Sequence, residues 1–396
     1  MTCDWTNPDG RIKLLHGDCM IRMSELQANS VEAIITDPPY GLAFMGKEWD
    51  DLSKQKLFHH KWAVQALRVL KPGGFLLACG GTRTYHRMVV AIEDVGFRIR
   101  DQLQWIYASG FPKSLDISKS IDKKLGASDQ REVIGYQTVP DMTGDNYGQG
   151  QREYTQVERT VTKAATEQAQ QWEGWGTALK PAFEPICMAQ KPLYEKTVAE
   201  NVMRHGVGGI NIDASRIGNE IIPVSEDGNS DSENNEHTGR WPSNIILGCF
   251  CENDQHESDC PVYILDKQSG YSQSKRSQLT SKPGTIYGGG AGLPSYTGQY
   301  GFNDGGGASR FFYTAKASVS ERRGSNHPTV KPVELMKYLV MLVTPPGGTV
   351  LDPFCGSGTT LEAAYICGFR AIGIEQDEEN LTTIMERHKQ MTLELF

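Results

Sequence analysis

The chain has 396 residues, of which 38% are hydrophobic and 22% charged, and 42 are glycine. This is enough apolar material for two or three domains, or for one domain with a large insertion, and the glycines predict long loops. No apolar run approaches the length of a membrane helix, the first residues lack the pattern of a signal peptide, and the nine cysteines are spread as reduced thiols are. We therefore expect a cytoplasmic protein and not a secreted, membrane or fibrous one.

The net charge of −8 at first argues against a nucleic-acid partner. Residues 219–238 alone hold six carboxylates and no Lys or Arg, so the remainder of the chain is near −2. A local basic face can bind phosphates whatever the global charge. The net charge therefore decides nothing about nucleic acids.

The first hundred residues alternate short apolar strands with amphipathic helices. We expect strands at 12–16, 31–36, 75–79 and 97–107, and helices at 20–27, 61–70 and 85–95, with a stop at residues 71–74. This alternation is typical of a parallel sheet covered on both faces. A further strand at 183–190 is expected to pair with the strand at 97–107.

The middle of the chain is different, since residues 113–180 and 194–308 are polar and weakly periodic. Between residues 284 and 307 ten of 24 positions are glycine, and aromatic residues lie between them: Tyr287, Tyr296, Tyr300 and Phe302. No helix or packed strand tolerates that composition. The segment is either a surface loop or a mobile loop that places aromatic rings against a ligand.

Regular structure is expected to return after residue 309. We expect strands at 311–316, 348–351 and 371–374, and helices at 333–343, 359–366 and close to the C-terminus. This β-α-β unit at the end of the chain has to be completed by the N-terminal strands.

The segment TVLDPFCGSGTT reads as a strand, a glycine turn and the start of a helix. Gly356 and Gly358 allow the backbone to approach a ligand there. Glu375 lies 17 residues after Gly358, at the end of the next strand, where a carboxylate can accept both hydroxyls of a ribose. The turn lacks the third glycine and the Lys of phosphate-binding loops. We therefore expect a nucleoside ligand without a polyphosphate; a packing turn is the alternative.

A second motif, Asp37-Pro38-Pro39-Tyr40, ends the strand at 31–36. The prolines fix φ and turn the carbonyls outward, so a carboxylate and a C=O converge as acceptors beside an aromatic ring. Two acceptors and a stacking ring suit a planar group with an exocyclic NH₂. Taken alone, the tetrapeptide is also compatible with a turn that merely ends a strand.

Together the motifs resemble those of the amino-group DNA methyltransferases that use S-adenosylmethionine, over roughly residues 12–110 and 310–380. DPFCGSG is similar to their cofactor motif, DPPY to their catalytic tetrapeptide, HPTVKP to the segment before the cofactor strand, and Gly17-Asp18 to their acidic position beside the adenine. The catalytic motif comes first and the cofactor motif last, which is the order of the β class.

The resemblance implies a permuted Rossmann-like α/β fold, with a mostly parallel sheet, helices on both faces and an inserted target-recognition region. Residues 1–112 and 309–396 would form the two halves of the methyltransferase domain. Residues 113–193 would be an insertion with a return strand, and residues 194–308 the target-recognition region. The cofactor strand would lie beside the DPPY strand, at the reversal of strand order.

The resemblance also implies the site residues. The catalytic set is Asp37, Pro38, Pro39 and Tyr40. The cofactor-binding set is Asp18, Lys331, Asp352, Phe354, Gly356, Gly358, Thr359 and Glu375. Asp37 and the Pro38 carbonyl would accept the N–H bonds of a flipped-out base and Tyr40 would stack on it. Lys331 would approach the cofactor carboxylate, the alternative being a solvated lysine at a helix start.

The implied activity is sequence-specific methyl transfer from S-adenosylmethionine to the exocyclic N6 of adenine in double-stranded DNA, as in restriction–modification. Adenine is preferred because the tetrapeptide begins with Asp, although DPPY occurs with both bases. The alternatives are a cytosine-N4 DNA methyltransferase, a methyltransferase of protein glutamine or RNA, and a catalytically inactive DNA-binding protein. The resemblance is compatible with a homodimer, and no membrane partner is expected.

Two groups of cysteines invite a chemical role. Cys249, Cys251, His256 and Cys260 form the pattern C-x-C-x₄-H-x₃-C, which lacks the C-x₂-C knuckle of zinc ribbons. We therefore expect no metal. Cys355, inside the glycine turn, is expected to be a small filler and not a nucleophile.

Overall fold

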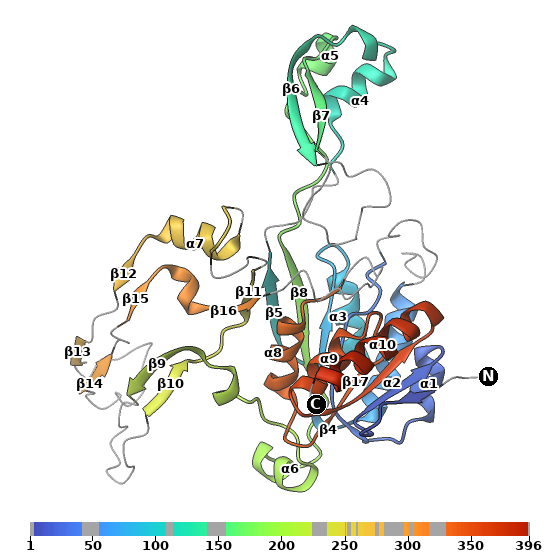
Figure 1. The fold of residues 1–396 in the computed structure, drawn as a ribbon, viewed down its shortest axis with the longest axis vertical. Helices are drawn as coiled ribbons and strands as arrows, with labels where there is room; N and C mark the ends of the chain where they lie inside the picture. The colour runs from blue at the N-terminus through green and yellow to red at the C-terminus, as the bar shows by residue number, and fades with distance from the viewer. Residues whose placement is uncertain are drawn as a thin grey trace, which may run out of the picture.

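The computed structural model describes residues 4–41, 55–107, 114–140, 156–223, 236–249, 251, 255–258, 260–273, 277–280, 297–300, 304–316 and 330–394. Within these residues ten strands form one sheet (Figure 1). In order across the sheet they are β1 (Trp5–Thr6), β2 (Ile12–His16), β18 (Arg370–Glu375), β17 (Thr349–Asp352), β3 (Val31–Thr36), β4 (Leu70–Cys79), β8 (Phe183–Gln190), β5 (Arg98–Ile106), β11 (Ile245–Cys249) and β16 (Tyr313–Lys316).

Most neighbouring strands of this sheet run parallel. The exceptions are β1 against β2, and β8 against both β4 and β5. The expected pairing of residues 183–190 with the strand before the insertion is thus confirmed. Strands from the two ends of the chain meet where β17 pairs with β3 and β18 pairs with β2, all in parallel. The expected mostly parallel sheet built from both ends of the chain is confirmed.

Helices from the two ends of the chain cover opposite faces of the sheet (Figure 1). On one face pack α1 (Cys19–Glu25), α2 (Gln55–Val69) and α3 (Tyr85–Asp94), and on the other α8 (Val333–Val343), α9 (Thr359–Ile366) and α10 (Glu378–Glu394). The strand residues alternate accordingly. Ala33 and Ile35 lie in the core beneath α8 to α10, whereas Ile34 between them packs with Trp62 of α2.

The pair β3 and β17 is the point where the chain direction across the sheet reverses. After β3 the chain passes through α2 on one face to β4, and after β17 it passes through α9 on the other face to β18. Open α/β sheets bind their ligands at the carboxyl ends of such a pair. The topology therefore marks the residues that follow β3 and β17.

The expected end of the helix before residues 71–74 is confirmed, since α2 ends at Val69. The strand expected at 75–79 begins earlier, because β4 starts at Leu70 and includes residues 71–74. A Cβ on Gly74 would lie 2.7 Å from the carbonyl oxygen of Glu32. The glycine thus allows β4 to approach β3 closely at an irregularity in the pairing.

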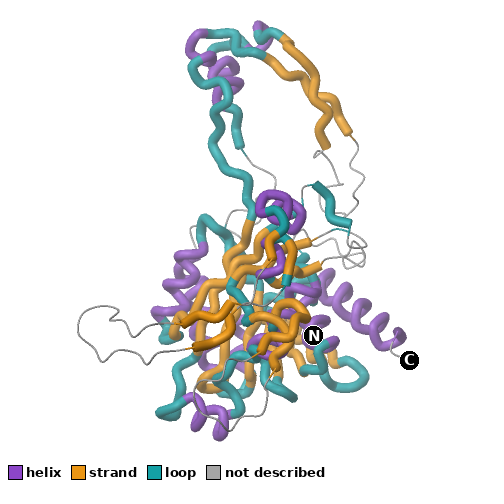
Figure 2. The backbone as a smooth tube through the Cα atoms, turned by 90° about the vertical axis from the view of Figure 1, so that its left-hand side faces the viewer, coloured by secondary structure: helices purple, strands orange, loops and turns teal. Residues whose placement is uncertain are grey.

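An arm, residues 114–180, is inserted between β5 and β8 and stands away from the sheet (Figures 1 and 2). It contains α4 (Ile117–Lys124), a 3₁₀ turn (Ser128–Gln130), β6 (Val133–Pro140), β7 (Gln156–Thr162) and α5 (Glu167–Gln170). Its central polar group is the buried carboxylate of Asp122, which pairs with Arg131. The same carboxylate accepts backbone N–H bonds from Ala165 at 2.9 Å and Thr166 at 3.2 Å.

Part of the expected target-recognition region belongs to the main sheet, since β11 lies between β5 and β16 and runs parallel to both. The remainder forms small elements: α6 (Val198–His205), β9 (Ile217–Pro223) paired with β10 (Glu236–Arg240), α7 (Pro261–Ser269), β12 (Ser272–Gln273) paired with β15 (Gly305–Gly306), β13 (Ser277–Thr280) paired with β14 (Thr297–Tyr300), and 3₁₀ turns (Asp213–Ser215 and Ala308–Phe311). Most of the Gly/Tyr segment 284–307, including Tyr287, Tyr296 and Phe302, lies outside the described residues.

Candidate active site

The Asp37-Pro38-Pro39-Tyr40 motif follows β3 directly and forms a compact hydrogen-bonded cluster. The Tyr40 hydroxyl donates to Asp37 Oδ1 at 2.7 Å and lies 3.1 Å from an oxygen of Glu184, in β8. Lys331 Nζ, just before α8, lies 2.5 Å from Asp37 Oδ2 and 3.1 Å from the same Glu184 oxygen. Asp37 is therefore held from both sides, by a phenol and an ammonium group.

This cluster contains two carboxylates and one ammonium group, and its cation is buried. Burial alone would lower the pKa of Lys331, but the carboxylates of Asp37 and Glu184 more than offset it and raise that pKa above its ordinary value. Burial and the same two carboxylates raise the pKa of Tyr40 well above its usual range. Lys331 therefore stays charged and Tyr40 stays a hydrogen-bond donor at neutral pH.

The sequence motifs do not reveal Glu184. It also lies near Tyr107, since burial and then the Glu184 carboxylate raise the pKa of Tyr107 to about 12. The available signal was a single charged residue in the otherwise apolar stretch FEPICMAQ. Pairing of β8 with β4, the neighbour of β3, is what brings Glu184 to the DPPY motif.

The glycine turn lies at the end of β17 and is braced by Glu375. The backbone N–H of Gly356 donates to Glu375 Oε2 at 2.8 Å, and the other carboxylate oxygen accepts the N–H bonds of Gln376 at 3.0 Å and Asp377 at 2.9 Å. Gly356 and Gly358 have φ of +48° and +80°, which side chains rarely adopt. Burial raises the pKa of Glu375. The expected turn is present, and its conformation requires glycine.

Asp18 lies beside this turn because β2 pairs with β18 in the register His16 with Glu375. Its carboxylate caps α1 by accepting the N–H bonds of Met20 at 2.9 Å and Ile21 at 3.2 Å. Both cap bonds use the same oxygen, Oδ1. Asp18 and Glu375 thus lie at the carboxyl ends of two neighbouring strands, and their contacts with a cofactor stay a prediction.

Asp352 joins the two halves of the site. It accepts hydrogen bonds from the Thr36 hydroxyl at 2.7 Å, the Thr360 hydroxyl at 2.5 Å and the Phe354 N–H at 3.0 Å. Burial raises its pKa to about 6. Because these contacts are internal, the structure places Asp352 as a link between β17, β3 and α9.

The remaining residues expected at the cofactor also make internal contacts. The Phe354 ring packs against the rings of Phe58 and Trp62 in α2, at centroid distances of 5.7 and 5.8 Å. The Thr359 hydroxyl lies 3.1 Å from that of Ser357 and 3.3 Å from Arg387. Lys331 contacts the DPPY cluster as described above. Their contacts with a cofactor stay a prediction.

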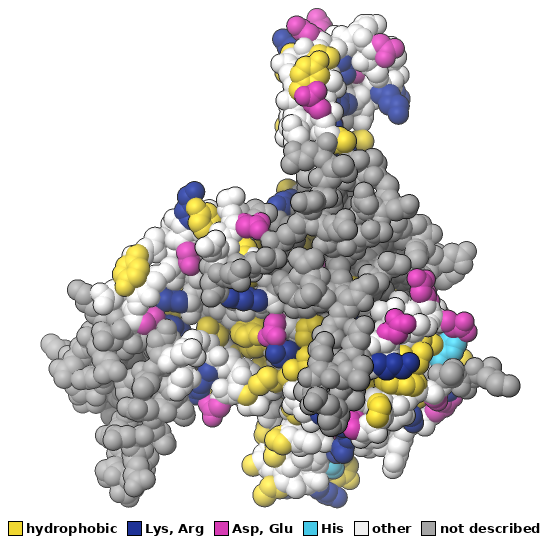
Figure 3. All heavy atoms as spheres, viewed as in Figure 1, with side chains coloured by type: hydrophobic (Ala, Val, Ile, Leu, Met, Phe, Trp, Pro, Cys, Tyr) yellow, Lys and Arg dark blue, Asp and Glu magenta, His cyan; other side chains and the backbone are white. Residues whose placement is uncertain are grey.

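The described surface carries both charge signs. On the face drawn in Figure 3, Lys and Arg side chains are interspersed with Asp and Glu. Within the part of the chain that the structure describes, no helix is both long and apolar enough to cross a membrane.

A protein family and several individual proteins are similar to this chain. The family model for DNA methylases of the N6/N4 type matches residues 31–386, from β3 to α10. A match of this extent defines the class, and the chain belongs to the N6/N4 DNA methylase family, enzymes that methylate amino groups of DNA bases.

Individual relatives are similar either at low sequence identity or over a short part of the chain. The type II methyltransferase M.HindIII of Haemophilus influenzae is 24% identical over 405 residues, which cover 92% of this chain and 91% of that protein. The DNA adenine methyltransferase YhdJ of Escherichia coli is 44% identical over 62 residues, or 16% of this chain and 21% of its own length. A crystal structure of M1.HpyAVI in complex with SAM aligns over 95% of this chain and 99% of that one, with 15% identity and a TM-score of 0.39.

Proposed function

We propose that this chain is a sequence-specific DNA methyltransferase that transfers a methyl group from S-adenosylmethionine to the exocyclic N6 of adenine, as part of a restriction–modification system. One observation carries the proposal. The Asp37 carboxylate and the glycine turn at Gly356 follow two adjacent parallel strands, and the Thr36–Asp352 hydrogen bond of 2.7 Å ties those strand ends together.

Asp37 is the group that would orient the target amine. Tyr40 and Lys331 each occupy one of its oxygens, and each carboxylate oxygen has a second lone pair. The carboxylate is 21% exposed, so a base that enters the site can donate an N–H bond to it. That bond, with one to the Pro38 carbonyl, draws the amine lone pair out of conjugation with the ring and positions it for transfer.

The two carboxylates of the cluster suit this reaction. Nitrogen gains positive charge as its bond to the methyl carbon forms, and it then loses a proton. Asp37 and Glu184, opposed by Lys331 alone, stabilise that charge in a partly buried site. The proton leaves along the hydrogen bond from the methylated nitrogen to Asp37, and Glu184 is a second acceptor 3.1 Å from Lys331.

Residues at the ends of β2, β17 and β18 would hold the cofactor. Its sulfonium supplies an electrophilic methyl group. Asp18 and Glu375 offer carboxylates for the adenine side and the ribose hydroxyls, and the turn at Gly356 and Gly358 offers close backbone approach. This donor set lacks a phosphate-binding lysine and carries acids, which fits a cationic nucleoside.

Adenine is favoured over cytosine because the tetrapeptide begins with Asp37 and because 62 residues are 44% identical to a protein named as a DNA adenine methyltransferase. Base-modification sequencing of DNA from a host that expresses the chain tests this. N6-methyladenine at one recurrent sequence is the expected result. N4-methylcytosine instead would replace the base assignment, and unmodified DNA from an expressed, folded protein would refute the activity.

Asp37→Ala separates the two halves of the site. We expect methyl transfer to be abolished while cofactor affinity, measured by calorimetry, stays within a few-fold. Glu375→Ala should instead weaken cofactor binding, because it removes both the proposed ribose acceptor and the carboxylate that accepts the Gly356 N–H bond. Loss of cofactor binding in Asp37→Ala with turnover retained at saturation would contradict the assigned roles.

A further inference from the structure

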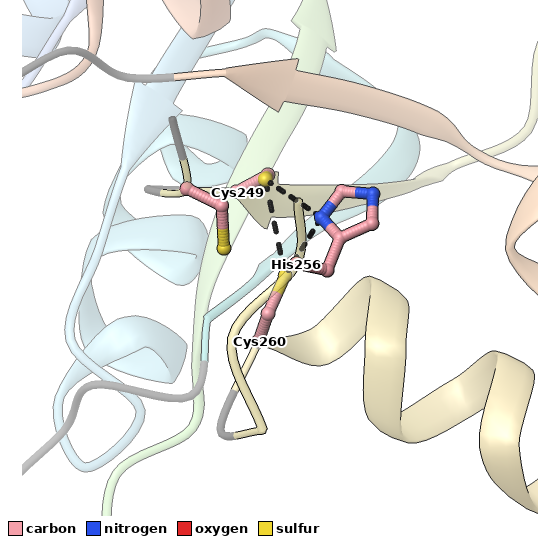
Figure 4. A group of neighbouring side chains, drawn as sticks. Cys249, His256 and Cys260 are labelled. Atoms are coloured by element: carbon pink, nitrogen blue, oxygen red, sulfur yellow. Dashed lines mark hydrogen bonds between the residues drawn. The ribbon is translucent and has the colours of Figure 1, made fainter. Parts of the chain in front are cut away.

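Four potential metal ligands converge at the carboxyl end of β11 in the main sheet. In the sequence they lie far from the DPPY motif. Cys249 is the last residue of β11, Cys251 follows it, and Cys260 immediately precedes α7, with His256 in the loop between. Their ligand atoms all lie within 4.8 Å of one another. Figure 4 shows the labelled side chains of Cys249, His256 and Cys260 pointing toward one another.

The distances among three of these atoms match a tetrahedral zinc site, and the Cys251 sulfur lies within 4.8 Å of them. His256 Nδ1 lies 3.4 Å from Cys249 Sγ and 3.5 Å from Cys260 Sγ, and the two sulfurs are 3.8 Å apart. Zinc bonds of about 2.3 Å to sulfur and about 2.0–2.1 Å to nitrogen, at tetrahedral angles, place sulfurs about 3.8 Å apart and sulfur about 3.5–3.6 Å from nitrogen. The same sulfur distance is far from the roughly 2.05 Å of a disulfide.

From this geometry we propose that Cys249, Cys251, His256 and Cys260 bind one Zn²⁺. Three thiolates and one imidazole form a complete Cys₃His ligand set, which leaves no position open for a reacting water. The site is therefore structural. A backbone donor supports one of the sulfurs, since the Glu257 N–H donates to Cys251 Sγ at 3.3 Å.

The spacing pattern that argued against a metal does not take account of the strand end at which two of the cysteines lie. A C-x₂-C knuckle places two sulfurs together by a tight turn, and the chain has none here. Cys249 is instead the last residue of β11, and the Cys251 sulfur, two positions further along the chain, lies in the same cluster of ligand atoms. The C-x-C spacing therefore serves a strand end as C-x₂-C serves a turn.

The proposed ion would fasten the small elements beyond β11 to the catalytic sheet. The local core has few buried members, Leu247, Cys249, Cys260 and Val262, and two of these are ligands. α7 in turn holds the residues before β16, because Asp266 accepts the N–H and the hydroxyl of Ser309, both at 2.8 Å. Zinc would thus order α7 and what α7 contacts, while the DPPY cluster is held by other strands.

Metal content of the purified full-length chain tests the proposal. Elemental analysis should find one zinc per chain in the unsubstituted protein and in the control Cys367→Ser, whose half-buried thiol lies outside the cluster. In Cys251→Ser and His256→Asn we expect retention after dialysis against a chelator to fall at least ten-fold. Equal zinc retention in all four proteins would overturn the site.

A second measurement does not depend on how the variants fold. Cobalt(II) added to the metal-free chain should give the sulfur-to-metal charge-transfer and visible bands of tetrahedral thiolate coordination, and zinc should then displace it.

Thermal unfolding is a third measurement. Chelation should lower the thermal stability of the unsubstituted chain and of Cys367→Ser but not of Cys251→Ser. A folded chain without cobalt bands after reduction, or a Cys249–Cys260 disulfide found by mass spectrometry, would refute zinc binding.

Discussion

Lys331→Met tests the buried cluster around Asp37 directly. Methionine keeps the length and the apolar stem of lysine but removes the ammonium group that lies 2.5 Å from Asp37 and 3.1 Å from Glu184. Both carboxylates would then share a site without a counter-ion. Lys337→Met is the matched control, because Lys337 pairs with Glu334 at 2.7 Å on the surface of the following helix.

The expected cost follows from the burial of each pair. Removing one member of a buried ion pair costs about 3–5 kcal/mol. Asp37 and Glu184 are 21% and 20% exposed, so water and proton uptake relieve part of that cost, and we expect about 2–3 kcal/mol. The surface pair in the control is worth about 0–1 kcal/mol. Lys331→Met should therefore be clearly less stable than Lys337→Met in urea unfolding.

The rate of methyl transfer separates a catalytic effect from simple destabilisation. Lys331 Nζ lies 2.5 Å from Asp37 Oδ2, so Lys331→Met loosens the carboxylate that would orient the amine, and we expect the rate to fall by about ten-fold or more while cofactor affinity stays within a few-fold. The assay is tritiated methyl transfer to DNA, with the variant held below its unfolding temperature. An unchanged rate together with a stability loss no larger than that of Lys337→Met would refute the cluster's role.

Three further changes have defined outcomes. Gly358→Ala should lose about 2–3 kcal/mol of stability, because φ is +80° and the new Cβ would lie 2.8 Å from Ile384, whereas the control Gly368→Ala, with φ +82° and open space, should lose only about 1 kcal/mol in urea unfolding. Asp352→Asn should flatten the pH dependence of stability. The pKa of Asp352 is about 6 in the folded chain and 3.8 ordinarily, so the unsubstituted protein should lose about 3 kcal/mol of stability at this site as the pH rises from below 3.8 to above 6. Unfolding of both proteins at pH 4 and pH 7 measures the difference. Asp122→Ala should make the arm sensitive to limited proteolysis while cofactor binding persists, because the bonds of Asp122 to Ala165, Thr166 and Arg131 are confined to the arm.

The sequence was informative where a motif and a strand end coincide. Apolar runs bounded by Asp37 and by the glycine turn predicted β3 and β17, and the two ligand motifs then had to face the same edge of a parallel sheet. β11 was harder to assign, because its five residues lie in a polar region and become a sheet strand only through pairing with β5 and β16.

Side-chain partners across the sheet were beyond a reading of local pattern. The resemblance implies that Lys331 approaches the cofactor carboxylate, which stays a prediction; no local pattern predicted its contacts with Asp37, Tyr40 and Glu184. Those contacts depend on β8 running antiparallel beside β4, more than 140 residues after β3 in the chain. No periodicity within a short stretch of the sequence predicts that these residues are neighbours.

The two halves of the site share one physical arrangement. Asp37 accepts hydrogen bonds from Tyr40 and Lys331, and Glu375 accepts the N–H bonds of Gly356 and its own successors, so each carboxylate has protein donors before any ligand binds. A buried carboxylate without donors would cost about 1–3 kcal/mol or more, and this arrangement removes that cost. Each carboxylate oxygen keeps a second lone pair, so a ligand N–H can add to these bonds without displacing a protein donor. On the roles proposed above, an amine with two N–H bonds would donate one to Asp37 and one to the Pro38 carbonyl, whereas a group with one donor would leave one of these acceptors unpaired, so the arrangement favours an amino group.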